Sequence, residues 1–148
     1  MWTRPCRNIE MDKIFKPHEV DALIPKLENI FMHMEACQKR TQELASSRPA
    51  KGAPLTAKEI AESARIRSQM EFLLGVIQED INLIGEMGGV VKDLLMGLVD
   101  FLGRVAGEDV WLCWKRGEKK VNFWHPLDAG FTERQTLGRA EDRTSITH

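Results

Sequence analysis

The fold class is decided by residues 110–125, which read VWLCWKRGEKKVNFWH. Two runs rich in aromatic and β-branched residues, 110–114 and 121–125, have the composition of β-strands. The charged segment that joins them contains a glycine, as hairpin turns commonly do. We therefore predict an antiparallel β-hairpin whose reversal lies between Trp114 and Val121.

Two long helices are predicted before this hairpin. In residues 17–46, apolar side chains recur at steps of three and four and line one face of a helix. The second helix spans residues 56–87: Thr56 and Glu59 form a capping box at its start, and two glycines follow its last turn. The linker between the helices is short and rich in Ser, Pro and Gly, so we expect an antiparallel helical hairpin.

Residues 90–101 fit two different structures. Val90, Leu94 and Leu98 are spaced four apart, which favours a helix. The run Leu98-Val99-Asp100-Phe101 is equally typical of a short strand. Periodicity alone leaves both structures open.

Three tryptophans, Trp111, Trp114 and Trp124, fall within the predicted hairpin. They could form an aromatic platform for a base, a sugar or a peptide. They could equally supply the core of a small sheet that packs against the helices. The composition leaves both roles open.

The charge balance excludes two classes of partner. The chain has 21 basic and 22 acidic residues and a net charge of −1, which is no signature of nucleic-acid binding or of attachment to an acidic membrane. The most apolar stretch, 88–103, is interrupted by Lys92, Asp93 and Asp100, unlike a membrane span. We expect neither a nucleic acid nor a membrane as a partner.

Cysteine usage indicates the compartment. Cys6, Cys37 and Cys113 are widely spaced and include no Cys-x-x-Cys pair. A disulfide framework or a four-cysteine zinc site is therefore not expected, and a reducing compartment is favoured. The first residues lack the apolar core of a secretion signal. We expect a soluble, cytoplasmic protein.

The length of 148 residues suits one domain with its own core. Both ends of the chain lack periodicity, and Met11 is an alternative start. We expect a flexible N-terminal tail, a single α+β domain and a disordered C-terminal tail. Their ranges are 1–13, 14–137 (helical hairpin 17–88, β-sheet 89–126) and 138–148.

Several characteristic residues occur in a fixed order along the second half of the chain. They are Val91-Lys92-Asp93, Gly97-Leu98-Val99-Asp100-Phe101, Leu112-Cys113-Trp114, Gly117-Glu118, Trp124-His125, Gly130-Phe131 and Arg134. This order, together with the start of the first helix, resembles a family of prokaryotic proteins known as domain of unknown function 2203. The resemblance covers residues 14–137.

The resemblance implies that residues 90–101 form two short strands, because relatives often carry turn-forming residues where this chain has Leu94-Leu95-Met96. It also implies a bacterial protein, and it implies no function. Lys16 departs from the family pattern, in which a threonine caps the first helix. The combined prediction is an α+β fold, in which a long antiparallel helical hairpin precedes a small antiparallel β-sheet of about four strands.

Cys113 and His125 are the first candidates for chemistry. A thiolate and an imidazole are good zinc ligands, and a cysteine beside a histidine can act as a nucleophile. An odd number of residues in the hairpin loop would place both side chains on one face of the sheet, and an even number would place them on opposite faces. Two ligands are too few for a metal site, so we predict no metal and no cofactor.

Other polar residues could join them. Asp100 lies inside an apolar run, and its carboxylate either faces solvent or is buried with a partner such as Lys92 or Arg134. His125 stands at a strand end, and we expect its ring to bond a nearby carboxylate, Asp100 or Asp128. The complete candidate site on the sheet comprises Asp100, Cys113, Glu118, His125 and Arg134.

Two classes of function follow. The first is a non-enzymatic interaction or scaffold protein, a homo-oligomer that associates through its helical hairpin and has room for a protein partner. The alternative is a small ligand- or metal-binding domain, or an enzyme, with its site on the C-terminal sheet. The absence of a phosphate loop or an ordered catalytic triad weighs against an enzyme.

Overall fold

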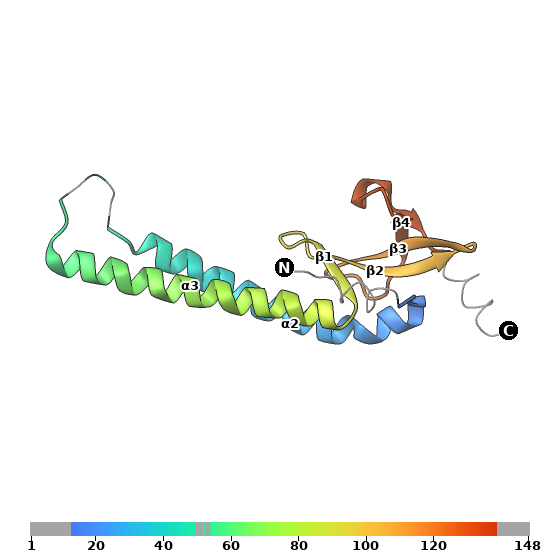
Figure 1. The fold of residues 1–148 in the computed structure, drawn as a ribbon, viewed down its shortest axis with the longest axis horizontal. Helices are drawn as coiled ribbons and strands as arrows, with labels where there is room; N and C mark the ends of the chain where they lie inside the picture. Colours follow the sequence, from blue (N-terminus) through green and yellow to red (C-terminus); the bar gives the residue numbers. More distant parts are fainter. Residues whose placement is uncertain (1–12, 50–51, 53, 139–148) are drawn as a thin grey trace. The chain divides into compact units, whose positions relative to one another are not determined.

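A computed structural model describes residues 13–49, 52 and 54–138 (Figure 1). Two helices, α2 (Pro17–Ser46) and α3 (Ala57–Glu86), precede an antiparallel five-stranded sheet, which confirms the predicted α+β fold. The described chain divides into two compact units, one formed by residues 13–28 with 84–138 and the other by residues 29–83. Apart from residues 13 and 138, the predicted tails lie outside the described residues.

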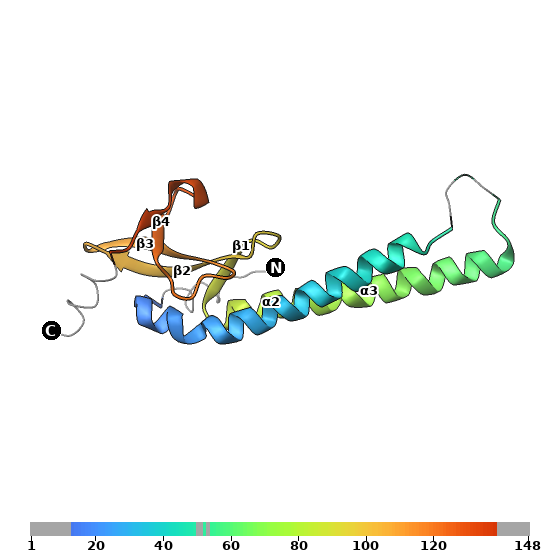
Figure 2. The same cartoon turned by 180° about the vertical axis from the view of Figure 1, so that it is seen from behind.

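The five strands follow one another in the sheet in the same order as in the sequence. Figures 1 and 2 label the first four of them. A short 3-10 helix, η1, lies between the last two strands. The bounds are β1 (Gly89–Asp93), β2 (Leu98–Val105), β3 (Glu108–Lys115), β4 (Phe123–Pro126), η1 (Phe131–Glu133) and β5 (Gln135–Thr136).

The ambiguous residues 90–101 are strands, as the resemblance implied. The Asp93 carboxylate accepts a hydrogen bond from the Met96 backbone N–H at 2.9 Å, and Gly97 has a φ of 71° that few other residues adopt readily. Leu95 is 87% exposed in this turn. A carboxylate and a glycine therefore reverse the chain here despite the apolar residues between them.

The sheet has five strands, close to the predicted number of about four, and the last strand, β5, lies beyond the range expected for the sheet. β5 consists of Gln135 and Thr136, which pair with Trp124 and Phe123 of β4. Both residues of β5 are exposed. Two exposed polar residues carry no hydrophobic alternation from which a strand could be predicted.

The helices begin as the sequence indicated. Thr56 and Glu59 form the predicted capping box, with the Glu59 N–H donating to Thr56 Oγ1 at 3.1 Å and the Thr56 N–H donating to Glu59 Oε1 at 2.9 Å. At the start of α2, Lys16 offers no capping side chain. Glu19 compensates in part, because its Oε1 accepts the Lys16 backbone N–H at 2.8 Å.

One face of the sheet forms the core of the first unit. The paired residues Val99 and Trp114, and Phe101 and Leu112, are fully buried on this face. Phe101 also meets Phe15 edge-on, with 5.1 Å between the ring centroids. Trp114 is therefore a core residue. Trp111 and Trp124 are half-buried.

The first turns of α2 bind the loop between β3 and β4. Asp21 Oδ1 accepts the backbone N–H of Val121, and Glu28 Oε2 accepts that of Gly117, each at 2.9 Å. Since these bonds anchor the loop from outside the sheet, they hold β4 in register with β3. The register determines which residues share the opposite face.

The second unit is the part of the helical hairpin formed by residues 29–83. Buried apolar side chains from both helices form its core, with Phe31 and Met34 from α2 and Ile66 and Ile77 from α3 among them. His33 Nδ1 and Asp80 Oδ2 lie within hydrogen-bond distance, at 2.5 Å, within this unit. Within the described part of the chain, neither helix is apolar enough along its length to cross a membrane.

Candidate functional site

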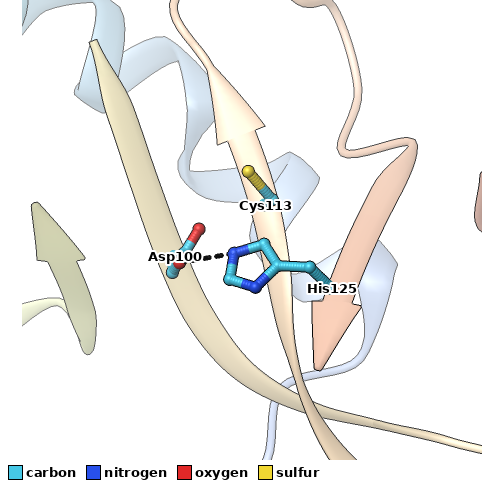
Figure 3. A group of neighbouring side chains, drawn as sticks. All are labelled: Asp100, Cys113 and His125. Carbon is cyan, nitrogen blue, oxygen red and sulfur yellow. Dashed lines mark hydrogen bonds and ion pairs between the residues drawn. The ribbon is translucent and has the colours of Figure 1, made fainter. Parts of the chain in front are cut away.

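Three neighbouring strands each place one polar side chain on the sheet face opposite the core (Figure 3). Asp100 on β2 pairs directly with Cys113 on β3, and Cys113 pairs with Phe123 on β4. His125 is two residues beyond Phe123, so its side chain points to the same face. The loop 116–122 has an odd number of residues, so Cys113 and His125 lie on the same face of the sheet.

The three side chains are close enough to act together. One carboxylate oxygen of Asp100, Sγ of Cys113 and one ring nitrogen of His125 lie within 4.8 Å of one another, and all three residues are buried. We call this group the Asp-Cys-His cluster. His125 Nε2 lies 2.9 Å from Asp100 Oδ2, so the predicted histidine–carboxylate bond is present, with Asp100 as its partner.

The other nitrogen of the ring determines where the protons are. His125 Nδ1 lies 2.9 Å from the carbonyl oxygen of Pro126. A carbonyl oxygen only accepts hydrogen bonds, so Nδ1 carries a proton and donates it. His125 Nε2 and Asp100 Oδ2 then share one proton, either as imidazolium with carboxylate or as imidazole with carboxylic acid.

Burial controls the ionisation of the other two groups. It raises the pKa of the Asp100 carboxyl, and it raises the pKa of the Cys113 thiol to about 12, with the negative charge of Asp100 adding to the effect. Cys113 is therefore a protonated thiol at neutral pH. A nucleophilic cysteine requires a depressed pKa, so this arrangement opposes that role.

A cavity of about 70 Å³ adjoins the cluster. The three cluster residues line it together with Lys92, Leu98, Ala129, Gly130 and Phe131. Asp100 Oδ1 is buried and has no hydrogen-bond partner among the described residues. An unsatisfied buried carboxylate oxygen is costly, and a functional role would account for it.

Glu118 and Arg134 lie outside the cluster and form a pair of their own. Arg134 Nη2 donates to Glu118 Oε2 at 2.6 Å. The guanidinium also lies 3.9 Å from the ring centroid of Phe123 and 4.7 Å from that of Phe131. Because Phe131 lines the cavity, this pair holds the segment after β4 beside the cluster.

The five predicted site residues therefore fall into two groups, Asp100 with Cys113 and His125, and Glu118 with Arg134. Sequence reasoning missed the cavity residues Ala129 and Gly130 and the carbonyl group of Pro126. Backbone groups and small side chains carry no chemical signal in a sequence. Only the path of the chain after β4 brings them to the cluster.

Comparison with known proteins identifies a family for this chain, and the description of that family names no activity. A family model described as "Uncharacterized conserved protein (DUF2203)" matches residues 13–137. Neither the curated proteins nor the solved structures include a match to the chain. The match covers most of the chain, and the protein therefore belongs to the DUF2203 family.

Proposed function

We propose that this protein binds one divalent transition-metal ion of the zinc class through Asp100, Cys113 and His125. The observation that carries the proposal is the convergence of three different ligand types, all buried, within 4.8 Å. The sequence prediction of no metal rested on two ligands. The direct pairing of Asp100 with Cys113 supplies a third.

The chemistry of the ligands selects the metal. A thiolate and an imidazole favour zinc and neighbouring transition metals over magnesium and calcium, which prefer oxygen ligands. The bond from His125 Nδ1 to the Pro126 carbonyl is also typical of metal-binding histidines, because it directs the Nε2 lone pair toward the ion. In this protein Nε2 faces Asp100 Oδ2, an atom of another proposed ligand.

Charge balance supports a divalent ion. A Cys113 thiolate and an Asp100 carboxylate carry two negative charges, and a neutral His125 adds none. A divalent cation makes the buried cluster neutral, which avoids the large cost of burying net charge. Without an ion, the same neutrality is reached with two protons, one on the thiol and one shared by His125 and Asp100.

Metal titration of the purified chain tests the proposal, with cobalt as a coloured substitute for zinc. We expect one ion per chain and a thiolate-to-cobalt charge-transfer band. Cys113→Ala should abolish the band and weaken binding by at least about tenfold, the loss typical of even an indirect contact. Cys37→Ala is the matched control, because Cys37 is the other buried cysteine of the described chain.

Two results would overturn this function. One is a wild-type chain that takes up no stoichiometric cobalt or zinc. The other is cobalt binding that Cys113→Ala leaves unchanged, because the ion would then lie elsewhere.

A second candidate function is self-association through the helical hairpin. α3 exposes large apolar side chains within the unit 29–83, with Phe72 71% exposed and Leu74 and Ile60 more than half exposed. Exposed apolar side chains of this size are available for contact with a second copy of the chain. The mass of the chain in solution tests this candidate independently of metal binding.

A further inference from the structure

We infer that the metal keeps one coordination position open to the adjoining cavity and that this position takes a small anion. The inference rests on the proposed metal site and assigns its ligand class. It makes the site a ligand-exchanging centre, as opposed to a structural one.

The ligand count leaves a position vacant. Zinc-class ions in proteins are usually four-coordinate, and sites with three protein ligands hold a water or substrate in the fourth position. Among the described residues, no further His, Cys, Asp or Glu joins the three of the cluster. Glu118, the nearest predicted candidate, is already bonded to Arg134 and to the Lys115 backbone N–H.

The cavity lies where the fourth ligand would bind, because all three cluster residues line it. Its volume of about 70 Å³ compares with roughly 30 Å³ per water molecule in the liquid. A ligand of a few heavy atoms fits this volume. Ligands of drug size usually occupy pockets of roughly 300 Å³ or more, so this cavity favours a smaller ligand.

The lining of the cavity favours negative charge. With the metal bound, the ion balances the charges of the Asp100 carboxylate and the Cys113 thiolate, so the protein ligands leave no net negative charge to repel an anion. Lys92 is the cationic side chain among the described lining residues, while Leu98, Ala129 and Phe131 are apolar. The Lys92 ammonium lies 4.5 Å from the centroid of the Trp111 ring. Its charge also acts on the cluster, because it opposes the burial that raises the pKa of Asp100.

Azide titration of the cobalt-loaded chain tests the inference. We expect a saturable change in the cobalt absorption spectrum. Lys92→Met keeps most of the side-chain length and removes the charge, and it should weaken azide binding roughly two- to fivefold, the range of one nearby cation at an exposed position. Lys120→Met, in the loop after β3, is the matched control and should change azide binding less than about twofold.

The outcomes separate the two proposals. A chain that binds cobalt with a thiolate band but shows no spectral response to azide retains the metal site and overturns the open position. Azide binding that Lys92→Met leaves at the wild-type strength overturns the assignment of the anion to this cavity. A chain that binds no cobalt overturns both proposals.

Discussion

Asp100 is buried in the cluster without a hydrogen-bond partner for one of its carboxylate oxygens among the described residues. It lies in the middle of β2 and is 1% exposed, and its other carboxylate oxygen bonds His125. Burial of an incompletely bonded carboxyl costs about 1–3 kcal/mol. A residue kept at that cost is better explained by binding than by folding.

Asp100→Asn separates binding from folding. The amide keeps the shape of the carboxyl and can donate to a neutral His125 Nε2, so the free energy of unfolding should stay within about 1 kcal/mol of the wild type. Metal affinity should fall at least about tenfold, because the anionic ligand is lost. Asp109→Asn, at an exposed pair with Arg104, is the control and should change neither quantity. Loss of more than about 2 kcal/mol of stability would show that the carboxylate is structural.

Glu19 makes the free energy of unfolding depend on pH. The hydrogen bond from the Lys16 backbone N–H lowers the pKa of Glu19 below its ordinary value of 4.5. Because the folded-state pKa is the lower one, the stabilisation is present above the unfolded-state pKa and is lost as pH falls through the folded-state value. Glu19→Ala should cost about 0.5 kcal/mol at neutral pH, since the group is largely solvated, and nothing once the carboxyl is protonated. Denaturant unfolding of both chains from pH 7 downward measures the difference, and a constant difference would contradict this account.

At the scale of residues, the sequence identified the chemistry but not its geometry. Cys113 and His125 stood out by type, and Asp100 by its place in an apolar run. Whether they share a face depends on the loop 116–122, whose conformation is fixed by Asp21 and Glu28 from α2. Each of those hydrogen bonds joins residues about 90–100 positions apart in the chain. No pattern of neighbouring residues in the sequence therefore predicts them.

At the scale of elements, the close packing of β2 against β3 leaves no space for a side chain at Gly103. A Cβ at Gly103 would lie 2.5 Å from Leu112 Cγ, whereas a Cβ at Gly75 in α3 would meet nothing within 4 Å. Gly103→Ala should therefore destabilise by about 1–3 kcal/mol through overpacking. Gly75→Ala, the matched control, should stabilise by about 0.5–1 kcal/mol, because alanine favours a helix. Denaturant unfolding distinguishes the two signs.

Element type was predictable where periodicity was long or turn residues were clear. The capping box at Thr56 and the glycines after α3 marked a helix at both ends. Residues 90–101 were ambiguous because spacing by four and a short apolar run coincide there. The Asp93 side chain decides in favour of a turn, and a hydrogen bond of that kind is one of several that an aspartate can make.

The exposed side chains of α3 give a prediction about association. If the helical hairpin mediates self-association, Phe72→Glu should convert an oligomer into single chains, because a charge cannot be buried in an apolar interface without a partner. Leu95→Glu is the matched control, since Leu95 is 87% exposed in the turn after β1. Light scattering after size-exclusion chromatography measures the mass. A wild-type chain that is already a single chain contradicts this candidate function.

At the scale of the whole molecule, one domain over residues 14–137 remains a prediction. The described chain forms two compact units, and each helix contributes residues to both. Unfolding of either unit would therefore remove helical residues that adjoin the other. This connection favours a single cooperative transition.

Zinc binding and two spectroscopic probes test that cooperativity together with the metal site. The sheet contains Trp111, Trp114 and Trp124, so fluorescence reports mainly on the first unit, whereas far-ultraviolet circular dichroism reports mainly on the helices. At a free zinc concentration 100-fold above Kd, stability should rise by about 2.7 kcal/mol, which raises Tm by roughly 5–10 °C. Both probes should give one transition and the same shift, and Cys113→Ala should abolish the shift. A zinc-dependent rise in the fluorescence transition alone would retain the metal site and show that residues 29–83 unfold as a separate domain.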